Sequence, residues 1–126
     1  MTVLIGYIDL LYIWKYMKEF ILLFRGGKTS TASQVDLVEH EDSWDQWMDH
    51  LENEGMLIDG LPMRDTGVLL SKKSMQESDL SANDGLTGYL IIQCEDMDTA
   101  IELAQECPIF DFDGKVEVRE LLNERG

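Results

Sequence analysis

Hydrophobic side chains recur along this chain in two different patterns, and each pattern predicts a different kind of element. Unbroken apolar runs at 18–25 (KEFILLFR) and 89–93 (YLIIQ) are typical of strands buried in a sheet. Residues 115–121 (KVEVREL) alternate apolar with polar side chains, which predicts a strand with one buried face. These three segments are the expected framework of one sheet.

Shorter apolar stretches between these segments predict further strands. Residues 56–58 (MLI) are apolar up to Asp59-Gly60, which we expect to end that strand. Residues 67–70 (GVLL) form the next candidate. The polar residues 72–84 contain little that a sheet could bury, so we predict a loop there.

A helical period replaces the strand pattern between Ser33 and Glu54. Six side chains recur at spacings of three and four residues and form one apolar stripe: Leu37, His40, Trp44, Trp47, Met48 and Leu51. Gly55 follows as the expected stop of this helix. A second helix is predicted over 99–105, with Asp98 as its N-cap and a proline shortly beyond its end.

The predicted elements follow the order β-α-β-β-β-α-β. Two helices beside an antiparallel sheet are typical of the ferredoxin-like α+β fold, with both main helices on one face of the sheet. The other face would then be bare and apolar. An exposed apolar face on a small domain favours pairing with a second copy, so we expect a homodimer that forms through the sheet.

Length and charge narrow the function classes. The 126 residues are enough for one domain with one core. With 25 acidic and 10 basic residues, the formal net charge is −15. This charge repels the phosphate backbones of nucleic acids and the surfaces of anionic membranes, so neither is an expected partner. Two cysteines, Cys94 and Cys107, are too few for a disulfide framework and favour a cytoplasmic protein.

The apolar residues 1–16 precede the first expected strand. A transmembrane helix needs about 20 apolar residues, whereas Gly6 and Asp9 interrupt this run. A signal peptide would have a basic start and a small-residue cleavage site, which the run lacks. We therefore expect residues 1–16 to be an extension ahead of a domain over 17–126. The extension is either the product of an upstream start codon or an arm that packs on the domain or a neighbour, with a membrane-touching segment as the remaining alternative.

Two stretches of the chain carry a resemblance to a known family. Residues 44–62 read W-x-x-W-M-x-x-L-x-x-x-G-M-L-x-x-G-L-P, and C-P-I at 107–109 is followed by G-K-V-E-V-R at 114–119. From residue 17 to residue 121, the chain resembles YCII-related proteins of the DGPF-type branch. This resemblance implies a ferredoxin-like fold of the dimeric α/β-barrel superfamily, whose members pair through their sheets and leave a cleft between helix and sheet.

The same resemblance bears on the site residues. Some YCII-like relatives are proposed to use a His-Asp pair in that cleft, but the matching histidine position is Ser43 here. The segment after which the DGPF branch is named reads QESD at 76–79. The loop that lines the cleft in the family therefore has different chemistry in this chain, and the pair is not carried over.

Five residues are candidates for a site in the expected cleft. His40 lies on the apolar stripe, where an imidazole could act as a general base near neutral pH, and Asp84 could orient it. Trp44 could form the wall of a pocket for a planar ligand, with Tyr89 at the cleft mouth and Arg119 binding an anionic group. The plainer alternatives are an inert helix histidine, a core tryptophan and, for Arg119, an ion pair between strands.

The sequence favours a binding protein without naming a reaction. We expect a small organic molecule to bind between the first helix and the sheet. One alternative is an enzyme of lyase, isomerase or oxygenase type with His40 as its base. The other is a structural or regulatory interaction module, whose cleft would be closed by side chains. The acidic residues of the first helix lack the spacing of a metal-binding loop, so no metal or other cofactor is expected.

Overall fold

The computed structural model describes residues 17–29, 32–73, 75–79 and 85–122, with the backbone alone for 75–79. The predicted extension over 1–16 and the candidate Asp84 lie outside the described residues. The elements in chain order are β1 (Lys18–Arg25), α2 (Gln34–Asn53), β2 (Leu57–Pro62), β3 (Thr66–Leu70), β4 (Met75–Asp79), β5 (Leu86–Cys94), α3 (Met97–Gln105), the 3₁₀ helix η1 (Pro108–Phe112) and β6 (Lys115–Glu120).

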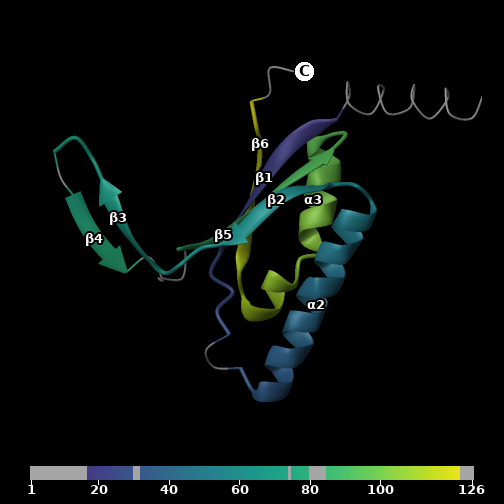
Figure 1. The fold of residues 1–126 in the computed structure, drawn as a ribbon, viewed down its shortest axis with the longest axis horizontal. Helices are drawn as coiled ribbons and strands as arrows, with labels where there is room; N and C mark the ends of the chain where they lie inside the picture. The colour runs from purple at the N-terminus through teal and green to yellow at the C-terminus, as the bar shows by residue number, and fades with distance from the viewer. Residues whose placement is uncertain (1–16, 30–31, 74, 80–84, 123–126) are drawn as a thin grey trace, which may run out of the picture.

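One four-stranded antiparallel sheet organises the molecule, in the strand order β2-β5-β1-β6. The two central strands, β5 and β1, are the two unbroken apolar runs of the sequence. Both α2 and α3 lie on the same side of this sheet (Figure 1). The expected ferredoxin-like α+β arrangement is therefore confirmed.

The two faces of the sheet differ in what covers them. Along β1, Phe20, Leu22 and Phe24 are buried, whereas the alternate residues Ile21 and Leu23 are only half-buried. The helices cover the first set, which we call the helix face; the second set belongs to the open face. Side chains of directly paired residues in an antiparallel sheet share a face. The pairing register therefore assigns the residues of β2, β5 and β6 to one face or the other.

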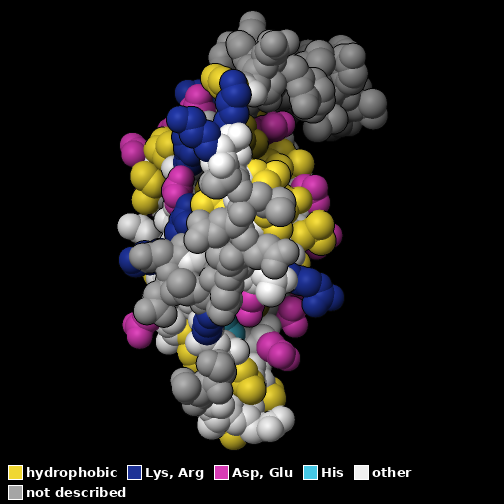
Figure 2. All heavy atoms as spheres, turned by 90° about the vertical axis from the view of Figure 1, so that its left-hand side faces the viewer, with side chains coloured by type: hydrophobic (Ala, Val, Ile, Leu, Met, Phe, Trp, Pro, Cys, Tyr) yellow, Lys and Arg dark blue, Asp and Glu magenta, His cyan; other side chains and the backbone are white. Residues whose placement is uncertain are grey.

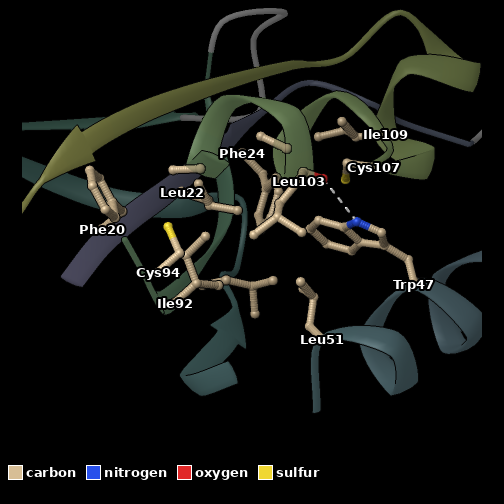
Figure 3. Close-up of a cluster of buried hydrophobic side chains, with 13 residues drawn as sticks. Phe20, Leu22, Phe24, Trp47, Leu51, Ile92, Cys94, Leu103, Cys107 and Ile109 are labelled. Carbon is tan, nitrogen blue, oxygen red and sulfur yellow. Dashed lines mark hydrogen bonds between the residues drawn. The ribbon is translucent and has the colours of Figure 1, made fainter. Parts of the chain in front are cut away.

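A single hydrophobic core lies between the helix face and the two helices (Figure 3). Trp47 and Leu51 of α2 are buried against Leu103 of α3 and the central strands. The Trp47 Nε1–H donates a hydrogen bond of 3.1 Å to the Leu103 carbonyl oxygen. This bond satisfies the one polar group of a buried indole, so the ring can fill the core without an unpaired donor.

Helix ends follow the capping chemistry of the sequence, with one correction. Ser33 caps α2 by accepting a hydrogen bond from the Asp36 backbone amide at 3.1 Å. The N-cap of α3 is Asp96 and not Asp98, since the Asp96 carboxylate accepts from the Thr99 amide at 2.8 Å. The Thr99 hydroxyl also donates to this carboxylate, and the two hydrogen bonds lower the pKa of Asp96 below its usual value. Asp98 lies in the first turn instead, where its negative charge interacts favourably with the positive end of the helix dipole.

The second strand is longer than the apolar pattern predicts. Asp59 and Gly60 do not end it, because β2 continues to Pro62 along β5. Gly60 sits opposite Leu90, and a Cβ on this glycine would clash with the Leu90 side chain and lie 2.7 Å from the Tyr89 carbonyl oxygen. The glycine is therefore needed for close strand packing, although its residue type indicates a turn.

The prediction of a loop over 72–84 is wrong for residues 75–79, which form β4. This strand pairs antiparallel with β3 and makes a separate two-stranded sheet that projects away from the body (Figure 1). Its residues show no apolar alternation, so the sequence carries no strand signal there. Residues 75–79 form a strand because they pair with β3, whose backbone groups can form hydrogen bonds with a partner strand of any side-chain composition.

Candidate functional site

A cavity of about 600 Å³ lies between α2 and the sheet. No residue of α3 belongs to its wall. We call it the Trp44 cavity; its lining residues are Phe24, Gly26, Gly27, Lys28, Thr29, Glu41, Trp44, Asp45, Met48, Gly60, Leu61, Pro62, Thr87, Gly88, Tyr89, Leu90 and Ile109. The cleft expected between the first helix and the sheet therefore exists.

Local sequence explains why Trp44 faces this cavity. Trp44 lies on the apolar stripe of α2, one turn before Met48, and both side chains pack against the core while remaining half-buried. The cavity floor comes from Phe24, the last buried residue of β1. Gly26 and Gly27 follow with φ values of 67° and 71°, a backbone conformation that favours glycine. They turn the chain away from the sheet beside the cavity.

Aromatic rings hold Trp44 in place. Its ring centroid lies 5.4 Å from that of Phe24 and 5.5 Å from that of Trp47, with interplanar angles of 83° and 80°. Such edge-to-face pairs add about 0.5–1.5 kcal/mol beyond area burial. Trp44 is therefore a rigid part of the cavity wall.

His40 supports Trp44 from one helical turn away and is not a lining residue of the cavity. Its Nε2 accepts a hydrogen bond of 3.0 Å from the Trp44 Nε1–H. Its ring lies 4.5 Å from that of Phe112 in η1. The buried Nδ1 atom has no hydrogen-bond partner among the described residues. Of the two ring nitrogens, one is therefore occupied by the indole and the other is buried outside the cavity wall. The catalytic role expected for His40 stays a prediction.

Tyr89 belongs to the cavity wall, but its side chain lies on the open face. Its neighbours Gly88 and Leu90 are buried on the helix face, and Tyr89 pairs in register with Leu23 and Leu61. Alternation along β5 therefore turns the phenol away from the helices. The apolar run of β5 did not indicate this orientation, because both of its faces look hydrophobic.

Arg119 is separated from the cavity and is not a lining residue. It lies on the edge strand β6 opposite Ile21, which places it on the open face, and 69% of its side chain is exposed. Its Nε lies 3.7 Å from the Glu117 carboxylate, which also binds Arg25 of the neighbouring strand at 3.2 Å. The ion pair between strands is therefore made by Arg25, whereas Arg119 pairs within its own strand. The role expected for Arg119 in binding an anionic group stays a prediction.

The sequence analysis did not predict three charged residues that line the cavity. Glu41 and Asp45 of α2 line it one turn apart, on either side of Trp44 in the sequence, and Lys28 lines it from the loop after β1. Helical spacing from Trp44 was the signal that could have found Glu41 and Met48, which lie three and four residues away.

Ser43, at the position that the resemblance links to histidine, does not line the Trp44 cavity. It lines a second hollow of about 470 Å³ between α2 and η1, together with His50, Trp47 and Cys107. Burial raises the pKa of the Cys107 thiol to about 12 and also raises that of Cys94. Both thiols therefore stay protonated at neutral pH, so neither is an activated nucleophile.

Two further findings concern the described part of the chain. No group of three or more His, Cys, Asp or Glu side chains there is arranged to hold a metal ion. None of the helices there is long and apolar enough to cross a membrane.

Comparison with known proteins gives the family. A search of the curated proteins finds no relative that matches this chain. The family model for the YCII-related domain matches residues 22–125, which include the whole sheet except the start of β1, both helices and every described lining residue of the Trp44 cavity. The fold and the match agree with the motifs at 44–62 and 107–119, and the chain belongs to the YCII-related family.

Proposed function

We propose that this protein binds a small organic molecule with a flat, apolar body in the Trp44 cavity. The observation that carries the proposal is the cavity itself. Its volume of about 600 Å³ falls within the range of roughly 300–1,000 Å³ for small-molecule sites. Its walls are mainly apolar and include a few polar groups, which is the usual composition of such sites.

The alternatives fit the geometry less well. An interaction module would have its cleft filled by side chains, whereas this cleft is open beside Trp44. An enzyme with His40 as base would need an imidazole nitrogen that reaches the cavity, whereas His40 does not line the cavity, its Nε2 accepts the Trp44 hydrogen bond and its Nδ1 is buried. We therefore assign His40 a positioning role: it fixes the indole that a flat ligand would contact.

The two indole N–H groups of α2 provide a direct test. In ¹⁵N-labelled protein, Trp44 and Trp47 each give a separate indole signal, which Trp44→Phe and Trp47→Phe variants would assign. Titration with 3-methylindole, a neutral flat probe, should shift the Trp44 signal in a saturable way. The Trp47 signal should move much less, because its N–H is buried against Leu103. Equal shifts at both signals, or none at either, would contradict the proposal.

We further propose that the protein is a homodimer that pairs through the open face. Four apolar side chains of the central strands, Ile21, Leu23, Tyr89 and Ile91, lie there only half-buried, and Leu61 beside them is 62% exposed. Figure 2 views the molecule from this side, and hydrophobic side chains are visible in its upper half, with most of the Lys and Arg side chains toward the left. A second copy would remove these side chains from water.

Light scattering after size exclusion tests the dimer. Wild-type protein should elute with the mass of two chains, and Ile21→Glu should elute as one. Val38→Glu is the matched control, because Val38 is 61% exposed on α2, away from the open face; it should remain a dimer. A monomeric wild type would overturn this part of the proposal and leave the cavity untouched.

We place this dimer in the cytoplasm. Both cysteines are free and buried, which suits a reducing compartment where thiols do not pair. Both side chains pack in the hydrophobic core as free thiols and form no disulfide.

A further inference from the structure

The wall of the Trp44 cavity has an uneven charge. Its acidic and basic side chains among the described residues are Glu41, Asp45 and Lys28. The two carboxylates come from one wall, the helix, and the single ammonium comes from the loop on another. The described lining residues of the cavity therefore carry a net negative charge, in a protein whose own net charge is −15.

These carboxylates are not neutralised within the structure. The side chains of Glu41 and Asp45 make no hydrogen bond or ion pair with a described residue, and both residues are exposed. Acidic side chains at positions i and i+4 of a helix repel each other by about 0.2–0.5 kcal/mol. A cation placed between them would relieve this repulsion and gain attraction from both.

The apolar walls restrict what kind of cation would fit. Phe24, Met48, Leu90 and Ile109 line the same space, so a bare metal ion or a small hydrated cation would leave most of the surface without a partner. An organic cation would fill it. The Trp44 ring, between the two carboxylates in the sequence, adds the attraction of an aromatic ring for positive charge.

We infer that the ligand of the Trp44 cavity is an organic cation, a protonated amine or quaternary ammonium attached to a flat apolar body. The inference rests on the proposed function and specifies its ligand class. The body packs along Trp44 and Phe24, and the positive group lies at the mouth near Glu41 and Asp45. Lys28 disfavours a second positive group on the other side, so one cationic centre is expected.

Three probes that share one ring system separate shape from charge. Tryptamine is positive at neutral pH, 3-methylindole is neutral, and indole-3-acetate is negative. Calorimetry or the Trp44 indole signal gives a Kd for each. Because both carboxylates are exposed, each ion pair is weak, and tryptamine should bind about 5-fold tighter than 3-methylindole. Indole-3-acetate should bind weakest, and raising the salt concentration should narrow the difference.

Two double variants test whether Glu41 and Asp45 cause the preference for tryptamine. Glu41→Gln with Asp45→Asn should reduce the preference for tryptamine over 3-methylindole from about 5-fold to none, measured as the ratio of the two Kd values on the same variant. The matched control is Glu39→Gln with Asp49→Asn, which removes the same charge from α2 at positions that do not line the cavity. This control should keep the preference for tryptamine.

The remaining outcomes distinguish the two proposals. If all three probes bind with the same Kd, or if indole-3-acetate binds tightest, the cavity is a binding site and the charge inference is wrong. If the Glu39/Asp49 control loses the preference as fully as the Glu41/Asp45 variant, the effect is one of net charge, which also overturns the inference. If no probe shifts the Trp44 signal, the proposed function itself fails.

Discussion

Two tryptophans three residues apart on α2 mark two different halves of the same cleft. Trp47 is 5% exposed, and its indole N–H bonds to the Leu103 carbonyl oxygen of α3. Trp44 is half-buried, borders a cavity, and bonds instead to His40 of its own helix. Both residues are of the same type, on the same stripe, and face the same sheet.

The difference comes from where α3 ends. This helix has only nine residues, and its buried side chains Ala100, Leu103 and Ala104 close the half of the cleft that contains Trp47. The chain then turns into η1, and only Ile109 of that segment reaches the wall of the Trp44 cavity. The comparison teaches that a core position and a pocket position can share one helical stripe and be separated only by the length of a neighbouring element.

Truncating the two indoles should give the largest contrast. Trp47→Ala should lower the free energy of unfolding by about 3–5 kcal/mol, because it empties a closed core. Trp44→Ala should cost about 1–2 kcal/mol, because part of its surface already contacts water. Guanidinium denaturation followed by circular dichroism measures both, and equal losses would remove the distinction between the two halves.

Narrowing the open half should have the next largest effect. Gly60→Ala places a methyl group against Leu90 and the Tyr89 carbonyl oxygen, and such overpacking costs about 1–3 kcal/mol. Leu70→Ala on β3 is the control, since its side chain is 67% exposed outside the four-stranded sheet and its loss should change stability little. A Gly60→Ala protein with the wild-type melting temperature would show that the sheet edge adapts freely.

Removing the cap of α2 should loosen the open half more than the closed half. Ser33→Ala leaves the Asp36 amide without its side-chain acceptor and should cost about 1 kcal/mol. Amide exchange should speed up at residues 37–41, the turns that lead to Trp44. Exchange at 47–51 should stay slow, because those residues are anchored by the core. Uniformly faster exchange along α2 would contradict a division of the helix into two halves.

The smallest effect concerns the cap of α3, the helix that closes the other half. Hydrogen bonds from Thr99 hold the pKa of Asp96 below its usual value. A depressed carboxyl pKa stabilises the folded protein above the unfolded value, and that stabilisation is lost as pH falls through the folded value. Asp96→Asn keeps a capping oxygen without the titration. The melting temperatures of wild type and Asp96→Asn should therefore converge from pH 5 to pH 2; a constant difference would refute this.

Strong local patterns made most of the fold predictable. The apolar runs of β1 and β5, the alternation of β6 and the stripe of α2 each specify an element by their period, and the structure has all four. The failures occurred where pairing overrides local chemistry. β4 is polar, yet it forms a strand because it pairs with β3. β2 continues through Gly60 because the strand pairs there with β5, and the missing side chain of the glycine leaves room for Leu90.

The site was predictable only in part, for a related reason. Helical spacing identified Trp44 as a wall residue and could have identified Glu41. Spacing did not show that His40 bonds to Trp44, which depends on the rotamers of both side chains. It also did not show that Tyr89 and Arg119 lie on the open face, because that depends on which face of each strand the helices cover.

By itself, the sequence determined the kinds of elements, their order, the acidic character of the chain and its family, since all of these depend on residue types and on spacings within short segments. Only the tertiary structure decided which end of the cleft is closed and which is open. That outcome depends on where a nine-residue helix lies against a twenty-residue one. Contacts between segments more than fifty residues apart, such as Trp47 with Leu103, leave no periodic trace in either segment.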